Sequence, residues 1–121
     1  MALTILALVT CAGLKDHLRY NRALWQAVGA LQRAGVPDRD INGGWMVNGW
    51  LQYAHPEHAS RDTQGNIDVP WVNGSAQPPY MIANALSDGW ETLERFDYER
   101  WLGPSGHIYV LKVSRRLEQG Q

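Results

Sequence analysis

The sequence predicts an α+β domain in which an N-terminal long helix packs on a small, mostly antiparallel sheet of three or four strands. Two observations predict this fold. Between Lys15 and Ala34, apolar side chains recur with the period of a helix. From Val36 onward, short stretches rich in β-branched and aromatic residues alternate with Gly, Pro, Asn and Asp. The 121 residues suffice for one hydrophobic core and are too few for two.

The chain opens with an uncharged apolar run from Ala2 to Leu14. As a helix this run would be about 20 Å long, which is less than the roughly 30 Å hydrocarbon core of a bilayer. A core helix, a degenerate signal sequence and the end of a membrane helix all remain open. We therefore treat residues 1–14 as an apolar segment, either a remnant of a membrane helix or the N-terminal half of one long helix. We expect Cys11 in this run to be a buried structural thiol.

A helix is predicted for the next segment, from Lys15 to Ala34. Gly35 and Pro37 should end it, because glycine accepts the left-handed cap and proline cannot continue a helix. Lys, Arg and Gln occupy the opposite side of the predicted helix. We expect Leu24, Val28 and Leu31 to face the sheet. The apolar side chains that fall close to one face of the predicted helix are Leu14, Leu18, Leu24, Val28 and Leu31.

Strands and turns are predicted for the rest of the domain, which we place at residues 15–113, followed by a charged tail at 114–121. The polar stretch between His55 and Pro79 is long for a loop in a compact domain, which favours a functional role. Ser87 to Gly89 should form a tight turn, and Tyr98 to Leu102 a turn or a single helical turn. The predicted strands are Trp45 to Tyr53 with a bend at Asn48-Gly49, Tyr80 to Leu86, Trp90 to Phe96, and His107 to Val113.

Composition excludes several classes of protein. A single cysteine rules out a disulfide scaffold, and 11 basic against 12 acidic residues leave no global field that would recruit nucleic acid. The chain has six Trp and one Phe, so tryptophan should replace phenylalanine in the core. Trp50 and Trp71 lie nearer polar segments. The tryptophans expected where helix meets sheet are Trp25, Trp45, Trp90 and Trp101.

The candidate ligand-binding residues are aromatic. Trp45 and Trp50 flank Asn48, and two rings with an amide could hold a carbohydrate, with Trp71 as a further candidate from the polar loop. The same loop carries weak candidates for a metal site, which are His55, His58, Asp62 and Asp68. Their spacing completes neither a zinc nor a calcium site, so we predict a solvated loop, no metal and no cofactor. No serine or histidine has an identifiable catalytic partner, so we predict no catalytic residue.

Several short motifs resemble those of one protein family. They are Asn21, Arg22 and Trp25; Gly35, Val36 and Pro37; Asn42, Gly43, Gly44 and Trp45; Asn48, Gly49 and Trp50; Tyr98, Trp101 and Leu102; and Ile108, Tyr109, Val110 and Leu111. Together they resemble the soluble, extracytoplasmic C-terminal segment of bacterial membrane glycosyltransferases of the dolichyl-phosphate-mannose-protein mannosyltransferase type. The resemblance implies that the apolar run is the end of the last membrane helix of such an enzyme.

The resemblance also implies a function. In that family the catalytic carboxylate and the polyprenol-phosphate-sugar site lie among membrane helices that this chain does not contain. We therefore expect a non-catalytic, membrane-proximal accessory domain on the periplasmic face of the inner membrane. Its expected partners are the membrane surface, a membrane-embedded glycosyltransferase core or a glycan. The cations Lys15, Arg19 and Arg22 directly after an apolar run favour the opposite, cytoplasmic side.

Two other functions stay open. If the apolar run is only a core helix, the chain is a soluble cytoplasmic binding module, with carbohydrate as a candidate ligand. Alternatively, it is a small enzyme that uses the loop from His55 to Asp68.

Overall fold

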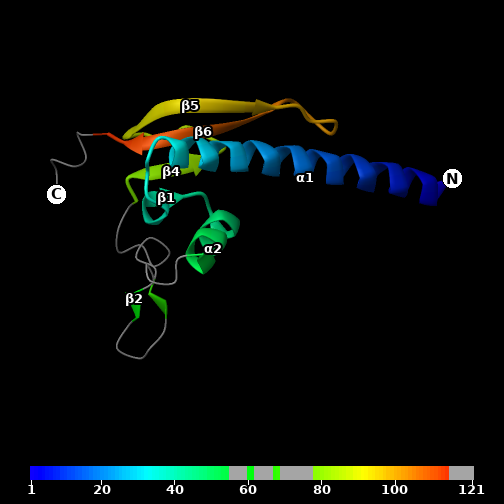
Figure 1. Ribbon diagram of the computed structural model, residues 1–121. Coiled ribbons are helices and arrows are strands. Elements are labelled where there is room, and N and C mark those ends of the chain that lie inside the picture. The colour runs from blue at the N-terminus through cyan, green and yellow to red at the C-terminus, as the bar shows by residue number, and fades with distance from the viewer. Residues whose placement is uncertain (55–59, 62–66, 69–77, 115–121) are drawn as a thin grey trace.

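One long helix lies across a four-stranded mixed sheet in the computed structural model, which describes residues 1–54, 60–61, 67–68 and 78–114 (Figure 1). The predicted α+β fold is thereby confirmed. Along the chain the elements are α1 (Ala2–Arg33), a 3-10 turn (Asp38–Asp40), β1 (Ile41–Asn42), α2 (Trp45–Ala54), β2 (Ser60–Arg61), β3 (Ile67–Asp68), β4 (Tyr80–Ala83), β5 (Trp90–Tyr98) and β6 (Gly106–Val113).

The main sheet has the strand order β1-β4-β6-β5. β6 pairs antiparallel with both β4 and β5, and the short β1 adds a parallel edge beside β4. The predicted turn at Ser87 to Gly89 is present, because Trp90 donates its N–H to the Ser87 carbonyl at 3.3 Å and Gly89 has φ +82°. Strand β5 continues to Tyr98, so the turn predicted from Tyr98 to Leu102 is replaced by the end of the strand and a loop that bends at residues 101–104. β2 and β3 form a separate antiparallel pair within the long polar segment.

Helix α1 ends just before Gly35, as the sequence predicts. Gly35 adopts φ +83°, and its N–H reaches the Gln32 carbonyl at 3.0 Å while the Val36 N–H reaches the Leu31 carbonyl at 3.1 Å. These two bonds form the Schellman motif that satisfies carbonyls at a helix C-terminus. The chain is thereby turned back toward the edge of the sheet.

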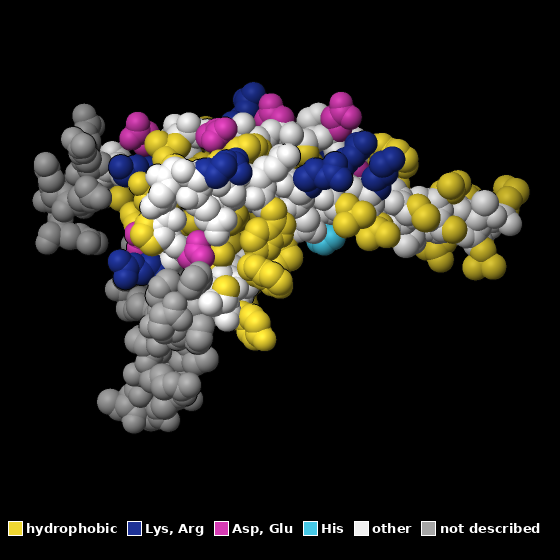
Figure 2. Space-filling view, in the orientation of Figure 1, with side chains coloured by type: hydrophobic (Ala, Val, Ile, Leu, Met, Phe, Trp, Pro, Cys, Tyr) yellow, Lys and Arg dark blue, Asp and Glu magenta, His cyan; other side chains and the backbone are white. Residues whose placement is uncertain are grey.

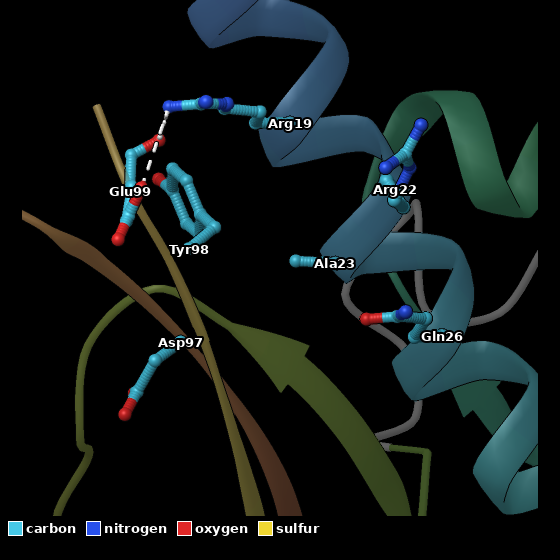
Figure 3. Close-up of a pocket in the computed structure, with 7 residues that line it drawn as sticks. All are labelled: Arg19, Arg22, Ala23, Gln26, Asp97, Tyr98 and Glu99. Atoms are coloured by element: carbon cyan, nitrogen blue, oxygen red, sulfur yellow. Dashed lines mark hydrogen bonds and ion pairs between the residues drawn. The ribbon is translucent and has the colours of Figure 1, made fainter. Parts of the chain in front are cut away.

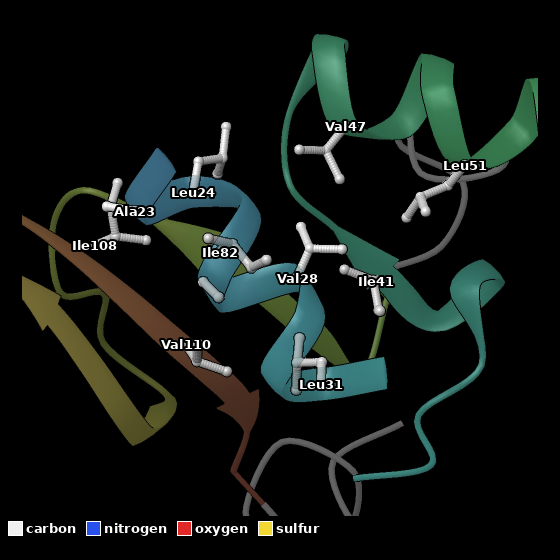
Figure 4. Packing of buried hydrophobic residues seen from close by; sticks show 11 residues of the cluster. Ala23, Leu24, Val28, Leu31, Ile41, Val47, Leu51, Ile82, Ile108 and Val110 are labelled. Atoms are coloured by element: carbon white, nitrogen blue, oxygen red, sulfur yellow. The ribbon is translucent and has the colours of Figure 1, made fainter. Parts of the chain in front are cut away.

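The core lies between the C-terminal half of α1 and one face of the sheet (Figure 4). Leu24, Val28 and Leu31 are fully buried, as predicted for the face toward the sheet. Leu14 and Leu18 share the predicted apolar face but are more than half exposed, because at this level α1 meets the rest of the domain through the opposite side, that of Ala12 and Asp16. The core is completed by Ala23, Ala27, Ile41, Val47, Leu51, Ile82, Ile108 and Val110.

Helix α2 replaces the strand predicted for Trp45 to Tyr53, and that prediction was wrong. Val47 and Leu51 are four residues apart and both buried, which is the spacing of one helix face rather than of a strand. Gly44 precedes the helix with φ +81°, and its carbonyl accepts the N–H of Asn48 at 2.9 Å in the first turn. The Asn48-Gly49 pair therefore lies within a helix and makes no bend.

The N-terminal part of α1 projects beyond the rest of the domain (Figure 1). Every residue from Ala2 to Cys11 is exposed, and Figure 2 shows apolar side chains around this projecting rod. Cys11 is exposed as well, so the expectation of a buried thiol was wrong, because nothing in the described chain packs against this segment. The large apolar side chains on the rod are Leu3, Ile5, Leu6, Leu8 and Val9, with exposed fractions between 52% and 81%.

Neither α1 nor α2 contains an apolar stretch of the length and hydropathy needed to cross a membrane.

Candidate functional site

A carboxylate of α1 fixes the loop between β5 and β6 at the point where the projecting rod leaves the body of the domain. Asp16 is only 9% exposed. Its Oδ1 accepts the backbone N–H of Trp101 at 2.7 Å, and its Oδ2 accepts that of Leu102 at 2.8 Å. Hydrogen bonds to a charged acceptor are the strong ones in proteins. Asp16 therefore holds Trp101 and Leu102 of this loop against the helix.

Cations and an exposed indole surround this contact. The ring of Trp101 is 58% exposed, and Lys15 Nζ lies 3.9 Å from its centroid. The guanidinium of Arg19 lies 5.9 Å from the same centroid, and its Nη1 donates to the Glu99 carbonyl at 3.3 Å. The expectation that Trp101 lies in the core was wrong, because its ring packs under cations at the surface. We call the shoulder the set of Lys15, Arg19, Arg22, Arg100, Trp101 and Leu102.

A pocket of about 280 Å³ opens beside the shoulder, between α1 and the end of β5 (Figure 3). Arg22 lines this pocket and makes no hydrogen bond or ion pair within the described residues, so its guanidinium is available to a ligand. Arg19 reaches across to Glu99, with 3.9 Å between Nη1 and Oε2. The residues that line the pocket are Arg19, Arg22, Ala23, Gln26, Asp97, Tyr98 and Glu99.

Asp97 belongs to this lining but is committed to other partners. His107 Nδ1 lies 2.7 Å from its Oδ1, and Arg95 Nε lies 2.9 Å from the same atom. The hydrogen bond to His107 and the charge of Arg95 hold the pKa of the Asp97 carboxyl below its ordinary value. Figure 3 shows its side chain directed away from Arg19 and Arg22. Asp97 therefore pairs with Arg95 and His107, and not with Arg19 or Arg22 on the α1 side of the pocket.

The Asp16 contact predicts a pH-dependent loop. The N–H groups of Trp101 and Leu102 hold the pKa of the Asp16 carboxyl below its ordinary value of 3.8, and Arg100 and Arg19 add to this effect. Because the folded pKa is the lower one, the stabilisation is complete above about pH 4 and is lost as the pH falls through the folded value. We expect the Trp101 and Leu102 amides to lose hydrogen-exchange protection in that acid range.

The variant Asp16→Asn tests the same contact at neutral pH. An amide offers one acceptor oxygen in place of two, so one of the two backbone N–H groups loses its partner at every pH. We expect fast exchange at these amides already at neutral pH, and Glu94→Gln, at an exposed position of β5, should leave them protected. Unchanged protection in Asp16→Asn would contradict the assigned role of Asp16.

The residues predicted to bind carbohydrate are not brought together as one site. Asn48 is buried, with its Oδ1 accepting the Gly43 N–H at 3.0 Å and its Nδ2 donating to Asn42 Oδ1 at 2.9 Å, so it anchors the start of α2. Trp45 is 89% exposed, which makes the expectation of a core position wrong, because it lies on the side of α2 away from Val47. Trp50 is exposed too and meets the half-buried Trp25 edge to face at 6.4 Å. Trp71 lies outside the described residues.

The predicted metal candidates fall in the polar segment. His55, His58 and Asp62 lie outside the described residues, and Asp68 lies in β3, where it pairs with Ser60. Among the residues that the structure does describe, no three His, Cys, Asp or Glu side chains form a group that could hold a metal ion.

The shoulder was missed by sequence reasoning. One signal was available, because Lys15, Arg19 and Arg22 follow the apolar run at the spacing of one helix face. The contribution of Trp101 could not be read in the same way, since the Asp16 contact joins residues 85 positions apart.

Comparison with known protein families, with curated proteins and with solved structures gives no significant match to this chain.

Proposed function

We propose that this chain is a non-catalytic, membrane-proximal domain that holds its folded body at a membrane through the projecting half of α1. The observation that carries the proposal is the exposure of an apolar helix segment that no part of the described chain covers. Soluble monomers rarely expose contiguous apolar surface of this kind, and such surface is typical of sites that contact a membrane or another protein. A helix that is apolar on all sides is normally buried.

The composition of the shoulder favours a membrane over other apolar environments as the surface that the rod contacts. An exposed tryptophan with lysine and arginine beside it is typical of the boundary between lipid tails and water, where the indole body is in the apolar phase and its N–H stays hydrated. Lys15 and Arg19 follow the rod on α1, and both lie at the ring of Trp101. An apolar stretch of this length is also typical of interfacial segments that enter the membrane without spanning it.

The family resemblance gives this membrane contact a role. In the glycosyltransferases that the sequence resembles, the corresponding segment follows the last membrane helix and lies beside the membrane-embedded catalytic core. We propose the same accessory position for this domain, with the rod packed in lipid or against membrane helices. Chemistry on a polyprenol-phosphate sugar would then belong to that core.

The proposal is tested by flotation of the purified chain with phosphatidylcholine vesicles. We expect the wild-type chain to float with the lipid. Leu6→Asp/Val9→Asp should abolish flotation, because each aspartate costs roughly 2.5–3.5 kcal/mol in an apolar phase. Both side chains are more than half exposed on the projecting rod, so the free energy of unfolding should stay within about 0.5 kcal/mol of the wild type.

Leu86→Asp is the matched control, because Leu86 is an exposed apolar side chain in the loop between β4 and β5, away from the rod. It should float as the wild-type chain does. Flotation of Leu6→Asp/Val9→Asp, or failure of the wild-type chain to float, would contradict the proposal.

A further inference from the structure

We propose that the pocket of Arg19 and Arg22, together with the rest of the shoulder, binds the phosphate headgroup of an anionic membrane lipid. This inference rests on the proposed membrane contact and names the lipid chemistry that the domain would select. It assigns a function to the cations at the base of the rod. Membrane contact through the apolar segment alone would not require these cations.

The local charge supports an anionic ligand. The shoulder, the pocket lining and Arg95, which pairs with Asp97, carry five cations against three carboxylates. The cations are Lys15, Arg19, Arg22, Arg95 and Arg100, and the carboxylates are Asp16, Asp97 and Glu99. This region is therefore net positive by two, whereas the whole chain has a net charge of -1. Asp16 moreover directs both of its oxygens at backbone N–H groups. Figure 2 shows the dark blue side chains gathered where the rod joins the body.

The pocket lining offers side chains that can bind a phosphate group. Arg22 makes no hydrogen bond or ion pair among the described residues, and Arg19 is held through Nη1 alone, at 3.3 Å from the Glu99 carbonyl oxygen and 3.9 Å from its carboxylate. A guanidinium fork matches the oxygens of a phosphate in a bidentate way. The hydroxyl of Tyr98 and the amide of Gln26 line the same pocket and add hydrogen-bonding groups. Its volume of about 280 Å³ accommodates a headgroup rather than a large solute.

The surroundings favour a lipid over a free anion. Trp101 and Leu102 are exposed beside the cations, and the apolar rod begins on the same helix within one turn of Lys15. A phosphate in the pocket would thus be attached to acyl chains that lie along the apolar side chains of the rod. Basic side chains next to an apolar anchor are typical of segments that prefer anionic leaflets.

Vesicle binding tests the inference. We compare vesicles of phosphatidylcholine alone with vesicles of equal parts phosphatidylcholine and phosphatidylglycerol. The wild-type chain should bind the anionic vesicles more tightly, with the preference decreasing as salt is added. Each cation near an anionic surface contributes about fivefold to binding, so Arg19→Gln/Arg22→Gln should lose on the order of twentyfold on the anionic vesicles and little on the neutral ones.

Arg33→Gln/Arg39→Gln is the matched control, because it removes the same charge at the other end of α1. It should keep most of the preference. Arg22→Gln alone, which breaks no hydrogen bond or ion pair among the described residues, should lose about fivefold in binding without any change in thermal unfolding. An equal loss in the two double variants would overturn the inference in favour of unspecific charge attraction.

The remaining outcomes separate this inference from the proposed function. If the wild-type chain binds both vesicle types equally, the anionic site is wrong and the membrane contact stands. Binding to neither vesicle contradicts both. Titration with inorganic phosphate identifies the source of the phosphate group: we expect no saturable binding, and saturable binding that removes the vesicle preference would overturn the lipid assignment.

Discussion

Leu31→Ala is expected to lower the free energy of unfolding by roughly 2–5 kcal/mol. The shorter side chain leaves a cavity between α1 and the sheet, and the surrounding side chains can fill it only in part. The side chain is 3% exposed and belongs to the core cluster with Val28 and Val110. Chemical denaturation with an unchanged slope would report the loss as a lower midpoint. Leu24→Ala should behave in the same way, since Leu24 lies in the same cluster.

Leu14→Ala provides the control on the same helix. Leu14 is exposed on the side of α1 away from Asp16 and the loop after β5, so its truncation should change the free energy of unfolding by less than about 0.5 kcal/mol. Equal effects at Leu14 and Leu31 would show that α1 is not docked through its C-terminal half.

Gly43→Ala should destabilise the fold by roughly 1–3 kcal/mol, the usual cost of forcing an extra group into a packed site. A Cβ at Gly43 would lie 2.7 Å from both Cβ and Cγ1 of Val47. Val47 is fully buried, and its branched side chain has one favoured rotamer in a helix, so it cannot turn away. The start of α2 would have to shift from the sheet. Thermal or chemical unfolding measures the loss.

Gly49→Ala should have the opposite sign. Gly49 lies inside α2 on its exposed side, and a Cβ there would meet nothing within 4 Å. Alanine in a helix interior is favoured over glycine by about 0.5–1 kcal/mol, so the variant should be more stable than the wild type. A loss of stability in Gly49→Ala would contradict the helical assignment of this segment.

Much of the fold could be predicted because its signals are local. The end of α1 depends on Gly35, and strands β5 and β6 have β-branched and aromatic residues in long runs. Helix α2 was mistaken for a strand because its aromatic residues and the Asn48-Gly49 pair have the composition of strands and turns. Its helical nature depends on the burial of Val47 and Leu51 against Ile41, which is a tertiary contact.

The candidate site was harder to predict for the same physical reason. Asp16 and Arg19 belong to a helix whose polar side chains would ordinarily be solvated. Their function depends on the loop after β5, whose position is set by the sheet and not by neighbouring residues in the sequence. Trp45 and Trp101 were expected in the core because large aromatic side chains usually are, yet aliphatic side chains fill the core here.

The partial docking of α1 has a consequence for its order in water. A peptide as short as the projecting rod forms an unstable helix by itself, because fixing the first turn costs more conformational entropy than one hydrogen bond returns. In this chain the docked half provides a nucleus that is already formed. Helicity should therefore decrease residue by residue from Asp16 toward Met1, which amide exchange by NMR would record as a gradient. Apolar surroundings would remove that gradient, because unpaired backbone groups are costly there. The rod would then become ordered at the moment it leaves water.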